Sequence, residues 1–271
     1  MDDSPLLHSA FYRFVPLADP QAWAERLRRL AGDLTGSLLL APEGLNGAVA
    51  GPRDAVLAFE AALRATAPFA AIPCRHSGAR RAPYARLAVR VKPELVALGV
   101  PGVSGLADTP DPWRLDPPAW RRLLQDERLV LIDNRNHFEA RLGRFRGALD
   151  PGVDHFRDFV PWLQRQLPEW QRDGRPVAMY CTGGIRCEKL GGWLREQGTP
   201  VYQLDGGILH YLEALPDAAR EWQGECFVFD NRLALDHRLQ PTTTTAAQVY
   251  DPDRPDEAWR LARAQRLANA A

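Results

Sequence analysis

Two of the 4 cysteines in the chain, Cys181 and Cys187, enclose a short loop whose composition suits sulfur chemistry. In the stretch VAMYCTGGIRCEKLGGWL, Cys181 follows an apolar run typical of a buried strand and precedes a segment of helical composition. A thiol at such a strand end faces loop N–H groups and the positive end of the helix dipole. Gly183 and Gly184 let these amides turn inward, and Arg186 adds a full positive charge. We therefore predict a stabilised, nucleophilic thiolate at Cys181.

Plainer interpretations of the same residues exist. Cys181 is alternatively a buried core thiol, although two glycines and an arginine are poor packing partners for one. Cys187 opens the predicted helix, where the dipole is expected to lower its pKa. It then either resolves a persulfide or sulfenate on Cys181 or packs in the first helical turn. Asp133 and Arg135 end another predicted strand, and they either orient the loop or the substrate or form a structural ion pair.

The composition bounds the class of protein. A chain of 271 residues, 45% of them hydrophobic, has room for about two domains. Lys+Arg and Asp+Glu both number 34, so the overall charge favours neither a nucleic acid nor an acidic partner. Scattered cysteines and the lack of an apolar leader after Met1 predict a reducing, cytoplasmic location. The longest apolar runs are too short to span a membrane, so no membrane partner is predicted.

Residues 1–98 are predicted to form a ferredoxin-like α+β domain. The patterns indicate a strand, a helix capped by Asp19, two strands joined by a turn, a second helix and a last strand. The corresponding ranges are 8–17, 20–31, 36–51, 53–65 and 84–92. This order is the split βαβ arrangement of that fold.

Residues 99–118 are rich in Pro, Gly and Asp, which predicts an ordered linker without regular structure. A second domain is predicted over 119–221 and an extension over 222–271, whose last part has helical composition. Within 119–221, helices are predicted at 119–126, 155–167 and 208–215, alternating with strands at 128–135, 177–180 and 199–207. Such alternation predicts a parallel sheet covered on both faces, with ligands at the carboxyl ends of the strands.

The loop carries a family resemblance. Its six residues, Cys181, Thr182, Gly183, Gly184, Ile185 and Arg186, resemble the active loop of a rhodanese domain, whose leading cysteine holds a persulfide cradled by loop amides. Cysteine phosphatases have five residues between their cysteine and arginine. Here Cys187 occupies that arginine position, and the shorter loop favours sulfur over phosphate.

The resemblance extends beyond the loop. The blocks APEGLNGAVAG, RLAVRVKPELVALG, IDNRNHFEARLGRFRGAL, YCTGGIRCEK and GECFVFDNRLALDHRL together resemble the rhodanese-domain tRNA uridine hydroxylase family, to about Leu239. This resemblance implies an oxidoreductase that hydroxylates C5 of the wobble uridine of tRNA with molecular oxygen, and it implies that Cys181 is catalytic. The implied partners are a tRNA anticodon loop and a sulfur or electron donor protein. No flavin, dinucleotide or metal motif accompanies it, so the cofactor stays unknown.

The tail departs from that family. Members commonly continue with a cysteine-rich, metal-like tail, whereas here no cysteine follows Cys226, so no metal site is predicted. Asp230, Asp236 and His237 are metal-ligand types, but a capped strand and turn explains them better. A thiosulfate or persulfide sulfurtransferase and a non-catalytic RNA-binding protein with a rhodanese fold remain as alternative functions.

Local basic stretches supply the candidate RNA contacts. The segment from Cys74 to Lys92 has no acidic residue, contains Tyr84, and offers phosphate and base contacts or simply a solvated basic face. Its possible RNA-binding residues are Arg75, Arg80, Arg81, Arg86, Arg90 and Lys92. A second basic cluster, Arg141, Arg144 and Arg146, lies before the sequence GALDPG and is a candidate to face the active loop.

Overall fold

The computed structural model describes residues 4–106 and 111–269. The chain divides into two compact units, with the division between Leu95 and Val96. Each unit has its own sheet and its own hydrophobic core.

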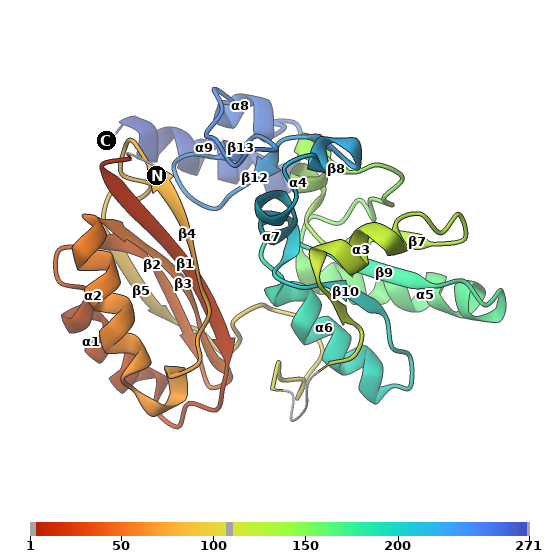
Figure 1. The fold of residues 1–271 in the computed structure, drawn as a ribbon, viewed down its shortest axis with the longest axis horizontal. Helices are drawn as coiled ribbons and strands as arrows, with labels where there is room; N and C mark the ends of the chain where they lie inside the picture. The colour runs from red at the N-terminus through yellow and green to blue at the C-terminus, as the bar shows by residue number, and fades with distance from the viewer. Residues whose placement is uncertain (1–3, 107–110, 270–271) are drawn as a thin grey trace. The chain divides into compact units, whose positions relative to one another are not determined.

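The first unit is a five-stranded sheet with two helices on one face (Figure 1). The strand order is β4-β1-β3-β2-β5; β1 pairs antiparallel with β3 and β4, and β5 runs parallel to β2. The elements are β1 (Leu6–Phe14), α1 (Pro20–Ala31), β2 (Thr35–Ala41), β3 (Gly44–Gly51), α2 (Arg53–Arg64), the 3₁₀ turn η1 (Ala67–Phe69), β4 (Cys74–Ala79) and β5 (Leu87–Val91).

Local sequence explains the helical layer. The Asp19 side chain accepts a hydrogen bond of 2.9 Å from the backbone N–H of Ala22, which caps α1 as predicted. The core between helices and sheet takes Leu27 from α1, Phe59 from α2 and every second residue of the strands, such as Leu7 and Phe11 of β1. The other strand face therefore carries the alternate residues.

The fold class of this unit is confirmed, but two elements differ from the prediction. The strand predicted at 84–92 is the edge strand β5, and the fourth strand of the ferredoxin-like order is β4 instead. Small and polar residues such as Ser77 and Gly78 hide the periodicity of β4. The strand β3 begins at Gly44, so Gly44, Asn46 and Gly47 all lie within it.

The second unit contains a four-stranded parallel sheet in the order β6-β10-β9-β7. The elements up to the last of these strands are β6 (Arg114–Leu115), α3 (Pro117–Leu123), β7 (Val130–Asp133), α4 (His137–Leu142), β8 (Gly143–Phe145), η2 (Phe156–Asp158), α5 (Phe159–Arg172), β9 (Val177–Tyr180), α6 (Ile185–Glu196) and β10 (Tyr202–Leu204). Then follow α7 (Gly207–Ala214) and η3 (Ala218–Arg220).

Helices cover both faces of this sheet, as the predicted α/β class requires. Val130 and Ile132 of β7 pack in the core formed with α5 and α6, whereas Leu131 packs in the core formed with α3 and α7. Alternate residues of each central strand are thus buried on opposite faces, which explains their continuous apolar runs. The carboxyl ends of β7 and β9 lie side by side, with Asp133 paired to Tyr180.

The prediction that 99–118 lacks regular structure is wrong. Arg114–Leu115 forms the edge strand β6, and Pro117 begins α3 behind the cap of Asp116, whose side chain accepts from the N–H of Ala119 at 2.7 Å. A strand of two residues is too short to show a period. Residues 107–110 of this segment lie outside the described residues.

The extension packs on the core of the second unit. Its strands are β11 (Trp222–Gly224), which pairs with β8, and the hairpin β12 (Cys226–Phe227) and β13 (Ala234–Leu235). The helices α8 (Ala246–Val249) and α9 (Pro255–Asn269) follow, the latter as its composition predicts. Within 4–106 and 111–269, no helix has the length and apolar character to cross a membrane.

Candidate active site

Cys181 lies at the carboxyl end of β9, and its loop leads directly into α6. Gly184 caps α6 with a φ of 95°, a left-handed conformation that glycine adopts at little cost. This turn aims the Gly184 N–H at the sulfur of Cys181, at a donor–acceptor distance of 3.1 Å. The side chain of Cys181 is 1% exposed. It is therefore both part of the core, as the plainer interpretation held, and surrounded by donors.

The loop makes Cys181 acidic. Burial raises the pKa of its thiol, but the Cys187 thiol, the Arg186 guanidinium and the backbone N–H groups of Cys187 and Arg186 outweigh burial and lower the pKa to about 6. An unperturbed thiol titrates at about 8.5. Most Cys181 side chains are consequently thiolates at neutral pH, which is the nucleophilic form.

Arg186 is held in place by Glu139 of α4. Its guanidinium donates two hydrogen bonds to the carboxylate, Nη2 to Oε1 at 2.7 Å and Nη1 to Oε2 at 2.9 Å. Glu139 is fully buried, and it also accepts from the backbone N–H of Asn136 at 3.2 Å and from the Thr182 hydroxyl at 3.4 Å. Burial would raise the pKa of Glu139, but Arg186 lowers it below its usual range. One carboxylate thus fixes the arginine, the loop threonine and the start of α4.

Cys187 differs from its prediction. Burial raises the pKa of its thiol well above the usual value, and the neighbouring Cys181 raises it further by accepting its hydrogen bond. The expectation that the helix dipole lowers this pKa is therefore wrong, because burial and the neighbouring thiolate outweigh the dipole. The Asn134 amide donates to the Cys187 sulfur at 3.7 Å. Cys187 is a protonated donor to Cys181.

Asp133 and Arg135 form a buried ion pair under the loop. The guanidinium donates to Asp133 from Nε at 2.8 Å and from Nη2 at 2.7 Å, and it also donates to the carbonyl of Gly143. The Tyr180 hydroxyl donates to Asp133 at 2.9 Å and thereby ties β9 to β7. These contacts are the ion pair of the structural interpretation, and a role in orienting the loop or the substrate stays a prediction.

The start of α7 closes the loop from the other side. The N–H groups of Ile208 and Leu209 donate to the carbonyls of Cys181 and Thr182 at 3.0 and 3.1 Å. Gly207 permits this approach, because a Cβ there would lie 2.4 Å from the Cys181 carbonyl oxygen. The loop is therefore clamped between α4, α6 and α7.

Comparison with known proteins places this arrangement in a family. Residues 7–95 match the model of the UPF0176 acylphosphatase like domain, and residues 116–214 match the rhodanese-like domain. A tRNA uridine(34) hydroxylase of Synechococcus elongatus is 48% identical over 233 residues, covering 85% of each chain. Those of Nitrobacter winogradskyi and Legionella pneumophila are 43% and 36% identical, covering 90% and 92% of this chain and 96% and 98% of theirs.

The chain belongs to the tRNA uridine(34) hydroxylase family. The resemblance seen in the sequence blocks is therefore confirmed. As in the family plan that the resemblance implied, a ferredoxin-like unit precedes a rhodanese-like one.

The basic stretch of this family member lies wholly in the first unit. Arg75 lies on β4 and Arg90 on β5, the two edge strands of the sheet. Arg80, Arg81 and Arg86 are exposed in the connection between these strands, and Lys92 is exposed after β5. The stretch therefore flanks the sheet on both edges and at one end.

The second basic cluster is largely engaged within its own unit. Arg141 donates to Glu257 at 2.7 Å, Arg144 lies 3.8 Å from Asp150, and Arg146 donates to the carbonyl of Arg220 at 3.1 Å. Arg141 and Arg144 line a cavity of about 380 Å³, whose described lining includes no residue of the 181–186 loop. The cavity therefore gives no support to the prediction that this arginine cluster faces the loop.

The acidic residues of the extension serve local structure. Asp230 binds the Arg232 guanidinium at 2.7 Å, and Asp236 accepts the backbone N–H groups of Arg238 and Gln240. In the described part of the chain, no group of three or more His, Cys, Asp or Glu side chains is placed to hold a metal ion.

Three site residues escaped the sequence analysis: Glu139, Asn134 and Gly207. A signal for Glu139 was present, because Asn136 and Glu139 have the spacing of a capping box directly after a strand. Such a box predicts only the start of a helix. The ion-pair partner of Glu139, Arg186, is 47 residues away along the chain. Only the fold brings them together.

Proposed function

We propose that the protein hydroxylates C5 of the wobble uridine of tRNA, with Cys181 as the reactive thiol. The observation that carries the proposal is the similarity over at least 85% of the chain to relatives named tRNA uridine(34) hydroxylase. The proposal also fits the reducing, cytoplasmic location expected from cysteine usage, where tRNA is found.

The loop geometry suits a sulfur anion on Cys181. The thiolate attacks the outer sulfur of a persulfide or thiosulfate donor; a new S–S bond forms while the donor leaves as a thiolate or sulfite. The resulting persulfide anion needs donors around its terminal sulfur. The Gly184 N–H, the first turn of α6 and Arg186 supply them. A donor protein would deliver the sulfur.

We assign positioning roles to the neighbours. Cys187 donates to Cys181 and keeps it ionised, while Glu139 orients Arg186. Asp133 and Arg135 brace the strand ends below the loop. Because a base inside a duplex is inaccessible to such a pocket, the substrate uridine is expected to arrive unpaired, as in an anticodon loop.

The deciding experiment is mass spectrometry of tRNA nucleosides from cells that lack the gene, complemented with wild type or Cys181→Ala. We expect 5-hydroxyuridine derivatives to disappear on deletion, to return with wild type and to stay absent with the variant. Unchanged nucleosides in all strains, in a host without a redundant pathway, would refute the proposal.

The alternative sulfurtransferase function rests on the same loop. It needs only the formation of the persulfide on Cys181 and the transfer of its outer sulfur to an acceptor. Purified protein is assayed for transfer from thiosulfate to cyanide alongside the nucleoside analysis. Transfer that depends on Cys181, together with unaltered tRNA, would favour that alternative. If the protein is instead a non-catalytic RNA-binding protein, we expect no sulfur transfer, no change in tRNA nucleosides and no effect of Cys181→Ala.

A further inference from the structure

The sheet of the first unit has one face covered by α1 and α2 and one face without a helix of that unit (Figure 1). On β1, Leu7 and Phe11 point to the helices, so His8, Ala10 and Tyr12 lie on the other face. We call this second face the open face. Its members on the other strands are Asn46 and Ala48 of β3, Ser37 and Leu39 of β2, Arg75 and Ser77 of β4, and Ala88 and Arg90 of β5.

A row of small side chains crosses the middle of the open face. Cross-strand pairing puts Ala10 beside Ala48, Ala48 beside Ser37, and Ser37 beside Ala88. Paired residues share a face, so these four side chains form one continuous strip. The strip crosses four strands, which at about 4.8 Å spacing gives it a length of roughly 14 Å. The strip is therefore a low floor with room for more than one planar group.

Aromatic rings border this floor along the strands. At one end, the Tyr84 ring stacks on His8, with centroids 5.9 Å apart and planes inclined by 21°. At the other end, Tyr12 lies beside Asn46 and makes an edge contact with Phe14 at 6.1 Å. Planar rings beside a small-residue floor suit the stacking of nucleobases, which is tolerant of sequence.

Arginines border the floor across the strands. Arg75 pairs with Ala10 at one edge, and Arg90 pairs with Leu39 at the other. The five strands contain no Asp or Glu, and the connection 80–86 adds Arg80, Arg81 and Arg86. Glu43, in the turn between β2 and β3, is buried and accepts the N–H of Leu95 at 2.7 Å. In a chain of zero net charge, this face is selectively suited to a polyanion.

We propose that the open face binds unpaired RNA nucleotides, with bases stacked between Tyr84 and Tyr12 and backbone phosphates at Arg75 and Arg90. The inference rests on the proposed tRNA substrate and deepens it, because it assigns the substrate a binding surface away from Cys181 in the sequence and on a different unit. A four-stranded α/β sheet that stacks two or three bases on its open face is an established mode of single-stranded RNA recognition. The occupant here is specifically an unpaired strand, because a duplex offers no free base faces.

The test measures binding of the full-length protein to a fluorescein-labelled oligouridylate by anisotropy over a range of salt concentrations. We expect Arg75→Ala/Arg90→Ala to weaken binding about tenfold or more and to reduce the salt slope by about 1.4, the value for two lost single-strand phosphate contacts. Tyr12→Leu keeps an apolar side chain but loses the stacking ring, so it should weaken binding about tenfold with an unchanged slope.

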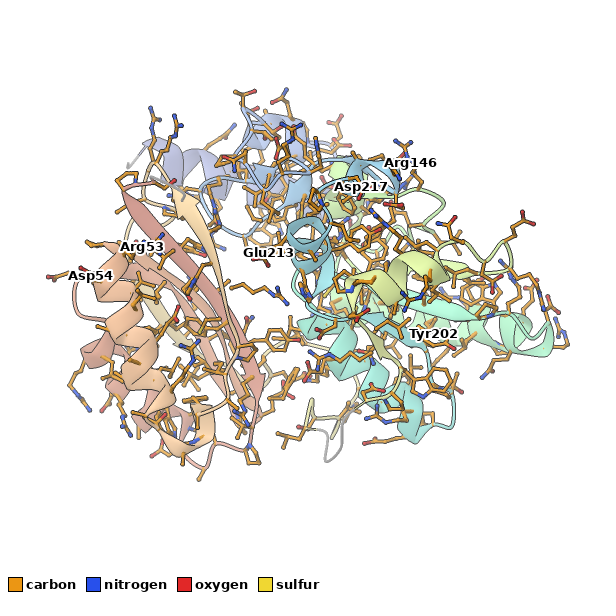
Figure 2. The ribbon with its side chains drawn as sticks, in the orientation of Figure 1. Arg53, Asp54, Arg146, Tyr202, Glu213 and Asp217 are labelled. Atoms are coloured by element: carbon orange, nitrogen blue, oxygen red, sulfur yellow. The ribbon has the colours of Figure 1, made fainter. Side chains whose placement is uncertain are left out.

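The matched control is Arg29→Ala/Arg53→Ala, which removes the same charge from the helical side. Both arginines are exposed, Arg29 on α1 and Arg53 at the start of α2, where Figure 2 labels it beside Asp54. Equal weakening by both arginine pairs would overturn the inference, as would equal affinity for an RNA duplex of the same length. An unfolding temperature equal to that of wild type verifies that each variant is folded. If Tyr12→Leu does not fold, Arg75→Ala/Arg90→Ala still tests the inference.

Binding and catalysis fail separately in this design. If Cys181→Ala leaves 5-hydroxyuridine unchanged while the open-face variants lose RNA affinity, the proposed function fails and the binding surface stands. If Cys181 is required but the open-face variants bind like wild type, the surface is wrong and the function stands.

Discussion

At the scale of single residues, the hydrogen bond from the Cys187 thiol to the Cys181 sulfur moves two pKa values apart. It lowers the pKa of Cys181 and raises the pKa of Cys187. We predict that Cys181 ionises with a midpoint near pH 6. The measurement is the ultraviolet absorbance of the thiolate as a function of pH, taken as the difference between wild type and Cys181→Ser. The thiolate fraction rises with pH through that midpoint. Because the Cys187 thiol stabilises this thiolate, Cys187→Ala should raise the midpoint, while Cys187→Ser keeps a donor and should shift it less.

A midpoint near the ordinary thiol value of about 8.5 in the wild type would contradict the loop electrostatics. A Cys187→Ala midpoint equal to that of wild type would show instead that Arg186 and the loop amides act alone.

The residue chemistry was only partly readable from the sequence. The glycines and Arg186 of the loop predicted an acidic Cys181 because they are adjacent in the chain. The raised pKa of Cys187 was not predictable in this way, since it depends on burial and on which thiol donates. Glu139 was missed for a similar reason: its partner comes from a distant element.

At the scale of elements, the loop depends on the close approach of α7. A Cβ on Gly207 would lie 2.4 Å from the Cys181 carbonyl oxygen and 2.6 Å from that of Thr182, and the residue has a φ of +66°. Gly207→Ala should therefore displace the loop, lower the unfolding free energy by about 1–3 kcal/mol and abolish most 5-hydroxyuridine formation. Thermal unfolding and nucleoside analysis measure the two effects.

Gly192→Ala on α6 is the matched control, because a Cβ there meets nothing within 4 Å. It should be neutral or stabilising by up to about 1 kcal/mol, as alanine favours helices over glycine. Full activity in Gly207→Ala would mean that the loop does not need this clamp.

Helices and strands were predicted well from the sequence where their apolar residues repeat over many positions. Long amphipathic helices such as α1 began and ended as predicted, whereas β6 has two residues and β4 has few apolar ones. Edge strands like these are defined by pairing with a neighbour, which no local window of sequence contains.

At the scale of the whole molecule, the extension supports the helix that carries Glu139. Phe138 of α4 packs against Phe227 with ring centroids 5.0 Å apart, and Arg141 binds Glu257 of α9. The sequence predicted an extension over 222–271 without assigning its contacts, because contacts between segments about a hundred residues apart leave no local pattern. The extension is thus structurally part of the second unit.

Glu257 of α9 makes a buried polar contact to α4. Its carboxylate is 1% exposed and accepts from Arg141 at 2.7 Å and from the backbone N–H of Asp251 at 2.8 Å. Glu257→Ala should remove about 2 kcal/mol, the usual cost of losing a buried, charge-assisted hydrogen bond. Hydrogen exchange should accelerate roughly thirtyfold in α4, since each 1.36 kcal/mol is a factor of ten.

The location of the effect distinguishes support of α4 from general destabilisation. Amides of β1 to β3 in the first unit should keep their exchange rates, and Asp253→Ala, an exposed acidic neighbour, should leave α4 unchanged. Because α4 holds Glu139 and Glu139 holds Arg186, Glu257→Ala should also alter the ionisation midpoint of Cys181. Faster exchange in α4 with an unaltered Cys181 midpoint would show that the ion pair between Glu139 and Arg186 keeps its geometry without the extension.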